Sequence, residues 1–212
     1  MSVILLGLIL AIASCEVSES QIQLEDSTDQ VSLLPQEPIN DAEEAALTYM
    51  IEEEKVARDV YNYLHNMWNH KSFQNIASSE QKHIDAVLSL IEKYELEDPV
   101  GTAQAGEFQN EDLQGLYDEL TEIGSVSLEN ALKVGGLIEE VDIVDLQDLL
   151  NNGIDNQDII LVFHNLMKGS RNHLRSYVDN LSKIGVIYNP SYLSAEEYED
   201  IITSPMEKGA GN

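Results

Sequence analysis

The sequence predicts an all-α protein built as an antiparallel four-helix bundle with a short additional helix near the C-terminus. Three observations lead to this fold class. Apolar residues recur with helical spacing over four long stretches between residues 41 and 184, and no convincing alternating strand pattern interrupts them. Short connections containing Gly, Pro and Asn separate these stretches. A chain of 212 residues with 43% hydrophobic content can bury one good core, so we expect one domain and at most two.

The first 15 residues, MSVILLGLILAIASC, predict an export signal. Their apolar run is too short to span a bilayer comfortably, although no Lys or Arg precedes it as in an ordinary signal. Cys15 is the only cysteine, and it follows small residues in a way that resembles the lipobox of exported lipoproteins. We therefore expect a lipidated protein of the cell envelope that touches the membrane through its anchor only. The alternative is cleavage after Ala13 and secretion of a soluble protein.

Residues 16–40, EVSESQIQLEDSTDQVSLLPQEPIN, predict a disordered acidic linker. The segment is rich in Ser, Gln, Glu and Asp, contains two prolines and has no sustained periodicity. Such a segment suits a tether between an anchor and a folded domain, which we place at residues 41–209.

Helix signals divide this folded part of the chain. The first helix is capped by Asn40 or Asp41 and runs to Trp68, with acidic residues in its first turn where the helix dipole favours them. Four further segments follow: a helix from Ser72 to Tyr94, a helical region that begins near Glu111, breaks around Gly124 and continues from Ser127 to Leu150, a helix from Asn156 to Ile184, and a short helix from the Ser194 cap to Thr203. The short helix either packs across the bundle or forms a contact in a homo-oligomer.

The chain carries 39 acidic and 11 basic residues, a formal net charge of -28. Such a surface repels nucleic-acid phosphates and anionic lipids and attracts cations, so no nucleic-acid partner is expected. Solubility or adaptation to a salty medium is the other interpretation of this charge. The sequence also lacks a phosphate-cradling glycine loop, a zinc-finger cysteine pattern and a nucleophile triad, which argues against nucleotide-binding and hydrolase functions.

Each of the four long helices places a metal-ligand type of residue on its apolar face near mid-length. These residues are Glu54 on the first helix, Glu80 and His83 on the second, Glu139 on the third and His173 on the fourth. Glu52 and Glu53 are predicted to point elsewhere. An unpaired carboxylate in a core costs several kcal/mol, and three together repel one another, so a cation is expected between them. The Glu-x-x-His spacing lets Glu80 and His83 reach one ion or two adjacent ions.

Two alternatives use neighbouring residues. Arg58, one turn after Glu54, and Arg171 or Arg175 near His173 can neutralise the acids in a buried ion-pair network without metal. Glu140 can replace Glu139 after a modest rotation of the helix.

Three residues are expected next to the ligands, where they can support them: Tyr61, Arg58 and Asp142. Asp142 lies one turn beyond Glu139 on nearly the same side. Tyr61 either donates a hydrogen bond to a ligand carboxylate or simply packs as a half-buried aromatic side chain.

The motifs carry a family resemblance. The order of Glu54 with Tyr61, Glu80-x-x-His83, Glu139 and His173 resembles the ferritin-like di-iron carboxylate superfamily. More closely, EEEKVARDVY, ASSEQKHIDAV, GGLIEEVDIVDL, GSRNHLRSYV and YLSAEEYEDIITSPMEKG resemble the ferritin-like family catalogued as domain of unknown function 2202, over residues 41–209. This resemblance implies a ferritin-like four-helix domain with a metal site in the bundle and no established activity. One departure stands out: Ser170 occupies the position three before His173, where the superfamily usually supplies a second Glu-x-x-His. A second metal ion would then be bound weakly, be absent, or be completed by Asp142, Asn172 or water.

The mixed carboxylate and imidazole set suits iron or manganese, one or two ions, and tolerates zinc. With two irons, the implied chemistry is oxidation of Fe(II) by oxygen or peroxide, as in a ferroxidase. A non-catalytic protein that binds, stores or hands on metal uses the same residues, and an interaction module without metal is the third alternative.

Overall fold

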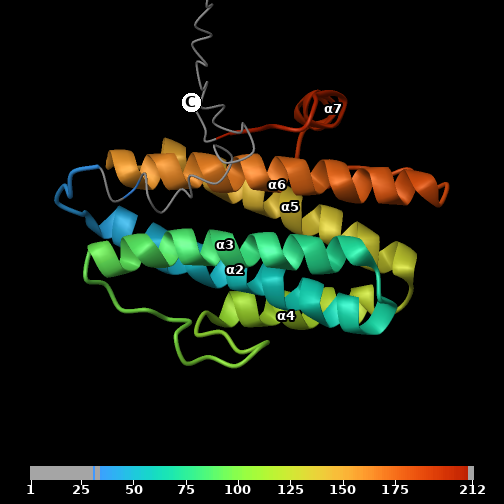
Figure 1. Cartoon of the computed structure of the whole chain (residues 1–212), viewed down its shortest axis with the longest axis horizontal. Helices are drawn as coiled ribbons and strands as arrows, with labels where there is room; N and C mark the ends of the chain where they lie inside the picture. The colour runs from blue at the N-terminus through green and yellow to red at the C-terminus, as the bar shows by residue number, and fades with distance from the viewer. Residues whose placement is uncertain (1–30, 32–33, 210–212) are drawn as a thin grey trace, which may run out of the picture.

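The computed structural model describes Val31 and residues 34–209, and these residues form an all-helical bundle without strands (Figure 1). The predicted export signal and Cys15 lie outside the described residues. Six helices follow one another along the described chain: α2 (Asp41–Trp68), α3 (Lys71–Lys93), α4 (Glu111–Gly124), α5 (Leu128–Asn151), α6 (Gln157–Lys183) and α7 (Ala195–Thr203). Each bound lies within one residue of the predicted bound, and the third region breaks after Gly124 as predicted.

Side-chain caps explain several of these bounds. The Asn40 side chain accepts hydrogen bonds from the backbone N–H groups of Ala42 and Glu43, and Glu43 returns one to the Asn40 N–H, which completes a capping box. Ser194 forms the same arrangement with Glu197 at the start of α7. At the other end of α2, Asn69 adopts a left-handed conformation with φ of 50°, and its N–H bonds the His65 carbonyl. α2 therefore ends in a tight turn that leads directly into α3.

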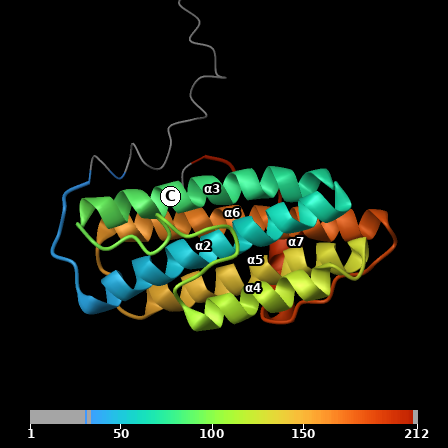
Figure 2. The same ribbon diagram turned by 90° about the horizontal axis from the view of Figure 1, so that it is seen from below.

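The helices pack in two main pairs. α2 packs most extensively against α3, and α5 against α6, and within each pair a short connection turns the chain back along itself (Figure 1). The pairs meet where α3 contacts α6 and where α2 contacts α5, while α4 lies against α2 and α5 (Figure 2). α7 contacts α6 and so packs across the bundle, as one of the two predictions for this segment expected. The centre of the bundle is thus lined by α2, α3, α5 and α6.

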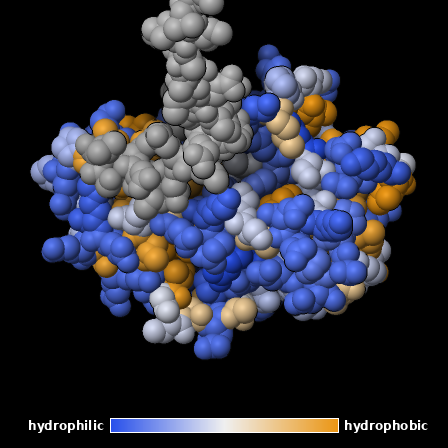
Figure 3. Space-filling view, viewed as in Figure 1, coloured by the Kyte–Doolittle hydropathy of each residue, from blue (hydrophilic) through white to orange (hydrophobic). Residues whose placement is uncertain are grey.

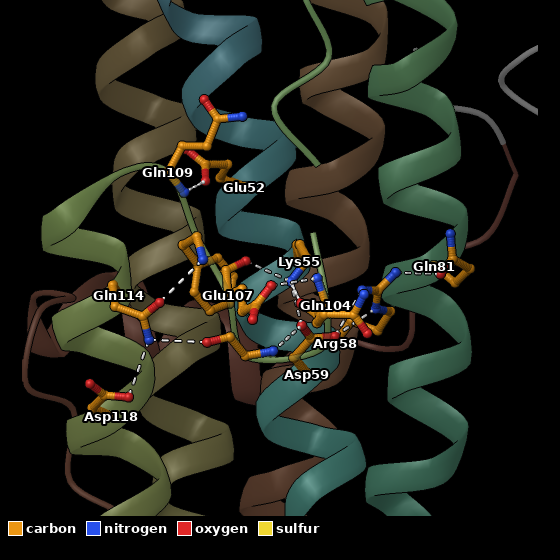
Figure 4. A network of polar contacts seen from close by, with 12 residues as sticks. Glu52, Lys55, Arg58, Asp59, Gln81, Gln104, Glu107, Gln109, Gln114 and Asp118 are labelled. Atoms are coloured by element: carbon orange, nitrogen blue, oxygen red, sulfur yellow. Dashed lines mark hydrogen bonds and ion pairs between the residues drawn. The ribbon is translucent and has the colours of Figure 1, made fainter. Parts of the chain in front are cut away.

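A buried lysine holds the α3–α4 loop against α2. Lys55 is 1% exposed, and its Nζ lies 2.7 Å from Asp59 Oδ2, 2.8 Å from the Gln104 carbonyl and 3.0 Å from the Glu107 carbonyl (Figure 4). The same ammonium lies 4.3 Å from the centre of the Phe108 ring, a cation–π contact. All the donors of a buried ammonium are thereby used, which makes this cluster a structural clamp.

Glu52 holds the end of the same loop. Its carboxylate accepts hydrogen bonds from the backbone N–H groups of Gln109 and Asn110, just before α4 begins. A carboxylate at this place is favoured by the positive end of the α4 dipole. Glu52 is therefore buried for a structural reason that differs from that of the acids in the bundle centre.

Residues next to both ends of the described chain also contact the bundle. Lys93 of α3 donates hydrogen bonds to the carbonyls of Val31 and Leu34 and pairs with Asp158 of α6 at 2.7 Å. In the segment assigned by the sequence to the linker, Leu34 and Gln36 thus contact the end of α3, whereas Pro38 and Asn40 contact the turn between α5 and α6. After α7, Glu207 pairs with Arg171 and Arg175 of α6. No helix among the described residues combines the length and apolar character needed to cross a membrane. The coloured surface in Figure 3 is largely hydrophilic, in keeping with the net charge.

Candidate metal centre

The five predicted ligand residues meet in the core of the bundle. Ligand atoms of Glu54, Glu80 and His83 all lie within 4.8 Å of one another, and so do those of Glu80, Glu139 and His173. Glu80 belongs to both groups, so its carboxylate lies between them. The two imidazole rings are nearly parallel, with centres 5.6 Å apart. Four helices thus contribute to two adjacent groups that share one carboxylate.

Each oxygen of the shared carboxylate faces a different imidazole. Glu80 Oε2 lies 2.7 Å from His83 Nδ1, and Glu80 Oε1 lies 2.9 Å from His173 Nδ1. The outer carboxylates complete the groups, since Glu54 Oε2 lies 3.1 Å from His83 Nδ1 and Glu139 Oε2 lies 3.3 Å from His173 Nδ1. The spacing of three residues between Glu80 and His83 places both on the same face of α3, as predicted.

The atoms of this cluster are close together but poorly hydrogen-bonded. Glu54 and Glu80 are 0% exposed and Glu139 is 1% exposed. Nevertheless, Glu54 Oε1, both oxygens of Glu80, Glu139 Oε2 and His173 Nδ1 have no hydrogen-bond partner among the described residues. Buried polar atoms are normally paired. The contact of Glu54 Oε2 with His83 Nδ1 is a hydrogen bond, whereas the short distances from Glu80 and Glu139 to the imidazole nitrogens lack the alignment of one. Carboxylate oxygens and imidazole nitrogens that converge in this way fit a bound metal ion.

Without metal, the imidazoles neutralise part of the carboxylate charge. Burial lowers the pKa of His173, but Glu80 and Glu139 raise it to about 10, and Glu54 and Glu80 likewise raise the pKa of His83 well above its usual value. Burial raises the pKa of Glu80, yet the two imidazoles bring it well below its usual range. Burial raises the pKa of Glu139 to about 7 despite the opposing effect of His173. A metal ion that binds here must displace protons from these groups.

Two further residues shape the centre. The Tyr61 hydroxyl, fully buried, donates a hydrogen bond of 2.5 Å to Glu139 Oε1, as one of the two predictions for this residue expected. Gly169 of α6 makes room for His83: a Cβ at this position would come within 2.6 Å of Cε1 and Nε2 of the imidazole. These two contacts orient one carboxylate and one imidazole of the cluster.

A family model described as an uncharacterized protein domain (DUF2202) matches residues 43–205, which include the whole cluster. The chain belongs to the DUF2202 family. It is 50% identical over 179 residues to the uncharacterized protein MJ0754 of Methanocaldococcus jannaschii, covering 84% of this chain and 96% of that protein. A solved structure, the crystal structure of hypothetical protein MJ0754 from Methanococcus jannaschii DSM 2661, matches with a TM-score of 0.80 at 50% identity, over 82% of this chain and 99% of the other.

The arginines that offered a metal-free alternative lie elsewhere in this DUF2202 domain. Arg58 donates to Asp59 of α2, which also contacts the α3–α4 loop, and to Gln81 of α3 (Figure 4). Arg171 and Arg175 both pair with Glu207 of the C-terminal segment. The expectation that Arg58 adjoins the ligands is therefore wrong, and no ion pair of the described residues joins these arginines to the cluster.

Adjacent glutamates of α5 have different surroundings. Glu139 joins the cluster, whereas Glu140 accepts hydrogen bonds from the Tyr188 hydroxyl and the backbone N–H groups of residues 191–193. Glu140 is 0% exposed but fully hydrogen-bonded, so its charge is compensated without a cation. Of the two alternatives that the sequence left open, the geometry favours Glu139.

Two acidic residues of α2, Glu52 and Glu53, were predicted to point away from the apolar face, yet each is only 4% exposed. Glu52 is hydrogen-bonded to the loop before α4, whereas neither carboxylate oxygen of Glu53 accepts a hydrogen bond from an N–H or O–H group of the described residues. Asp142, expected near Glu139, accepts a hydrogen bond of 2.9 Å from Ser170, the residue that stands where the superfamily usually has a glutamate. The uninterrupted burial of residues 50–57 explains the error, because helical periodicity allows only one buried face.

A groove of about 370 Å³ between α3 and α6 reaches His173. Polar side chains, among them Asn75, Ser79, Lys82 and Asn172, line it, and Met206 of the C-terminal segment borders it. The groove gives solutes from the medium a route to the imidazole edge of the centre.

Proposed function

We propose that this chain is a ferritin-like metalloprotein that binds one or two iron or manganese ions in the bundle core. The proposed ligands are Glu54, Glu80, His83, Glu139 and His173. The observation that supports this most strongly is the convergence of five ligand side chains from four helices, among them three fully buried carboxylates, most of whose facing atoms lack hydrogen-bond partners. The ligand order along the chain and the pairing of the helices support the ferritin-like assignment.

The shared carboxylate favours two ions over one. Each group offers one imidazole and one carboxylate of its own, and the two oxygens of Glu80 face opposite groups. Two ions in these places would be held by Glu54 and His83 and by Glu139 and His173, and Glu80 could contribute to both. The oxygen and nitrogen donors suit iron and manganese, and they also accept zinc.

In the enzymatic form of the proposal, bound iron or manganese supplies one-electron redox chemistry such as oxidation of Fe(II) by oxygen or peroxide. The protein positions the ligands and controls access of water and solutes to them. Tyr61 fixes the orientation of Glu139, burial keeps bulk water away from the carboxylates, and the groove at His173 admits a small solute. The imidazoles accept protons when metal leaves.

The alternative is a non-catalytic protein that stores metal or hands it on. Ser170 favours this alternative, because it leaves α6 with one ligand and the whole centre with three carboxylates and two imidazoles. Oxygen consumption during addition of Fe(II) separates the two functions: an enzyme oxidises Fe(II) faster than the free ion reacts, and a storage protein does not.

Export and lipid anchoring belong to the proposal and depend on residues 1–15, which lie outside the described residues. The apolar run and the lipobox-like position of Cys15 support them. Expression of the full chain and of Cys15→Ala in a host that lipidates exported proteins tests this part. Membrane association that disappears in the variant supports the anchor, and equal distribution of the two proteins contradicts it.

Elemental analysis of the full chain, purified without chelator or affinity tag, tests the metal centre. About two equivalents of iron or manganese are expected for two ions, and a His83→Ala and His173→Ala double variant should lose them. Glu139→Gln should also lose metal, whereas the matched Glu140→Gln should retain it. Absence of metal from the natural sequence after reconstitution with Fe(II) and Mn²⁺ would contradict the proposal.

A further inference from the structure

A second acidic site lies beside the metal centre. Glu53 of α2 and Asp142 of α5 line a cavity of about 30 Å³ whose other walls are apolar side chains of α2, α4 and α5, including Val56, Leu116 and Ile138. Tyr192, 61% exposed, stands at the rim and connects the cavity with the surface. None of the proposed ligands of the metal centre lines this cavity.

The carboxylates in this cavity lack partners. Glu53 is 4% exposed and Asp142 is 1% exposed, and neither oxygen of Glu53 nor Oδ1 of Asp142 has a hydrogen-bond partner among the described residues. Oδ2 of Asp142 faces the Ser170 hydroxyl at 2.9 Å, but the same hydroxyl also lies 3.1 Å from the Leu166 carbonyl. One hydroxyl hydrogen cannot satisfy both acceptors at once. Asp142 therefore shares its one hydrogen-bond donor, the Ser170 hydroxyl, with the Leu166 carbonyl.

The charged groups that act most strongly on these two acids are other carboxylates. Asp145 lies within hydrogen-bond reach of Glu53, so these two carboxyls can share a proton, and Glu54 also acts on Glu53. Glu54, Glu53, Glu139 and Glu80 act on Asp142. Lys55, next in sequence to Glu54, is fully used by the α3–α4 loop. Buried carboxylates in such a place need a cation or protons to remain in the core.

We propose that Glu53 and Asp142 hold a hydrated hard divalent cation, of the class of Mg²⁺, Ca²⁺ or Mn²⁺, in the cavity beneath Tyr192. The donors are oxygens without sulfur or imidazole, which is the preference of hard cations. A cavity of about 30 Å³ has room for roughly two centres of water size, so one ion and one water fill it, and the two carboxylates must supply most of the remaining ligand oxygens. The proposed ligands of the Glu and His centre are not among the donors of this site.

Manganese binding tests the site, because Mn²⁺ fits both kinds of donor set and free Mn²⁺ is counted by electron paramagnetic resonance. Four full-length proteins are compared after treatment with EDTA: the natural sequence, a Glu53→Gln and Asp142→Asn double variant, Glu52→Gln, and the His83→Ala and His173→Ala double variant. Glu52→Gln is the matched control, since Glu52 is equally buried but hydrogen-bonded to the loop before α4.

The acid double variant should bind one equivalent of Mn²⁺ less than the natural sequence, and Glu52→Gln should bind the full number. Excess Mg²⁺ should displace this equivalent and leave Mn²⁺ bound by the imidazoles in place, because imidazole donors disfavour Mg²⁺. The histidine double variant should retain one equivalent that Mg²⁺ displaces. Retention of this Mn²⁺ equivalent by the histidine double variant distinguishes the acidic site from the metal centre, so either proposal can be contradicted without the other.

Equal Mn²⁺ stoichiometry in the acid double variant and the natural sequence would overturn the inference and assign the acids to protonated carboxyls. Folding is checked independently by thermal unfolding in EDTA. The acid double variant should unfold at the same temperature or higher, since the amides remove buried charge, and Mg²⁺ should raise the unfolding temperature of the natural sequence only. A Mg²⁺-induced rise that is equal in the two proteins would also overturn the inference.

Discussion

Replacement of Gly169 by Ala should displace His83 from the metal centre while the bundle remains folded. A Cβ at position 169 would lie 2.6 Å from Cε1 and Nε2 of the His83 imidazole, whereas ordinary contacts between such atoms begin at 3.4 Å. The ring must therefore retreat by most of an ångström. Metal–ligand distances tolerate only about 0.2 Å, so the imidazole nitrogen can no longer coordinate at its original place.

The size of the effect follows from this displacement. Loss of correct ligand orientation typically lowers metal affinity by about 10–100-fold, or about 1.4–2.8 kcal/mol of binding free energy. The metal-free protein should behave differently. Ala is favoured over Gly by about 1 kcal/mol inside a helix, and the contact with the imidazole offsets part of this gain. Affinity for metal and stability without metal should thus change independently.

Gly115→Ala is the matched control. Gly115 is an exposed residue inside α4, and an added Cβ would meet nothing within 4 Å. This variant should gain up to about 1 kcal/mol in stability and bind metal as the natural sequence does. Urea unfolding in EDTA measures the stabilities, and competition of Mn²⁺ or Co²⁺ with a chelating dye measures the affinities. A folded Gly169→Ala variant with unchanged metal affinity would refute the assignment of His83 as a ligand.

Three further predictions concern protons and buried partners. The pKa of His173 is raised to about 10, so its protonated form stabilises the metal-free fold at low pH, and this stabilisation is lost as the pH rises towards 10. The pKa of Glu139 is raised to about 7, so the fold also loses stability when this buried carboxyl loses its proton. Stability in EDTA should therefore fall as the pH rises from about 5 to 10, in contrast to metal affinity, which should rise; stability that increases over this range would contradict the geometry. Tyr61→Phe leaves Glu139 without its donor and should cost about 1–3 kcal/mol in urea unfolding, with weaker metal binding as the second readout. Lys55→Ala breaks a buried ion pair and should cost about 3–5 kcal/mol, with faster proteolysis of the α3–α4 loop; unchanged proteolysis would show that the clamp is not needed.

The bounds of the helices were predictable because local signals fix them. Asn40, Ser127 and Ser194 each place a side-chain oxygen on the backbone N–H groups of the following turn. The five-residue cluster was predictable for a related reason. Apolar residues that recur every 3.6 residues form one stripe along a helix, and this stripe faces the core. An acid or a histidine within the stripe therefore lies close to the stripes of the other helices.

Helical periodicity could not predict that α2 is buried on several sides. One side of α2 meets α3, others meet α4 and α5, and the α3–α4 loop covers Lys55 and Asp59. Helical periodicity describes a single buried face, so it assigned Glu52 and Glu53 to other surroundings. The contact of a distant loop has no periodic signal, because it depends on where residues far apart in sequence meet. The run Glu52–Lys55, charged residues inside an apolar helix, was the available hint.

The neighbours Glu139 and Glu140 show why burial alone does not identify a functional acid. Both are almost fully buried, and the sequence could not choose between them. Glu140 receives a phenolic hydroxyl and backbone N–H groups from the segment before α7, so its negative charge is stabilised by neutral donors. Glu139 receives one hydroxyl, and its other oxygen points at a histidine and a second carboxylate. The two carboxylates differ in the number of hydrogen-bond donors that they receive. A buried carboxylate with too few donors gains the most from a bound cation. The same criterion singles out Glu53 and Asp142 and passes over Glu52, which has its donors from the loop.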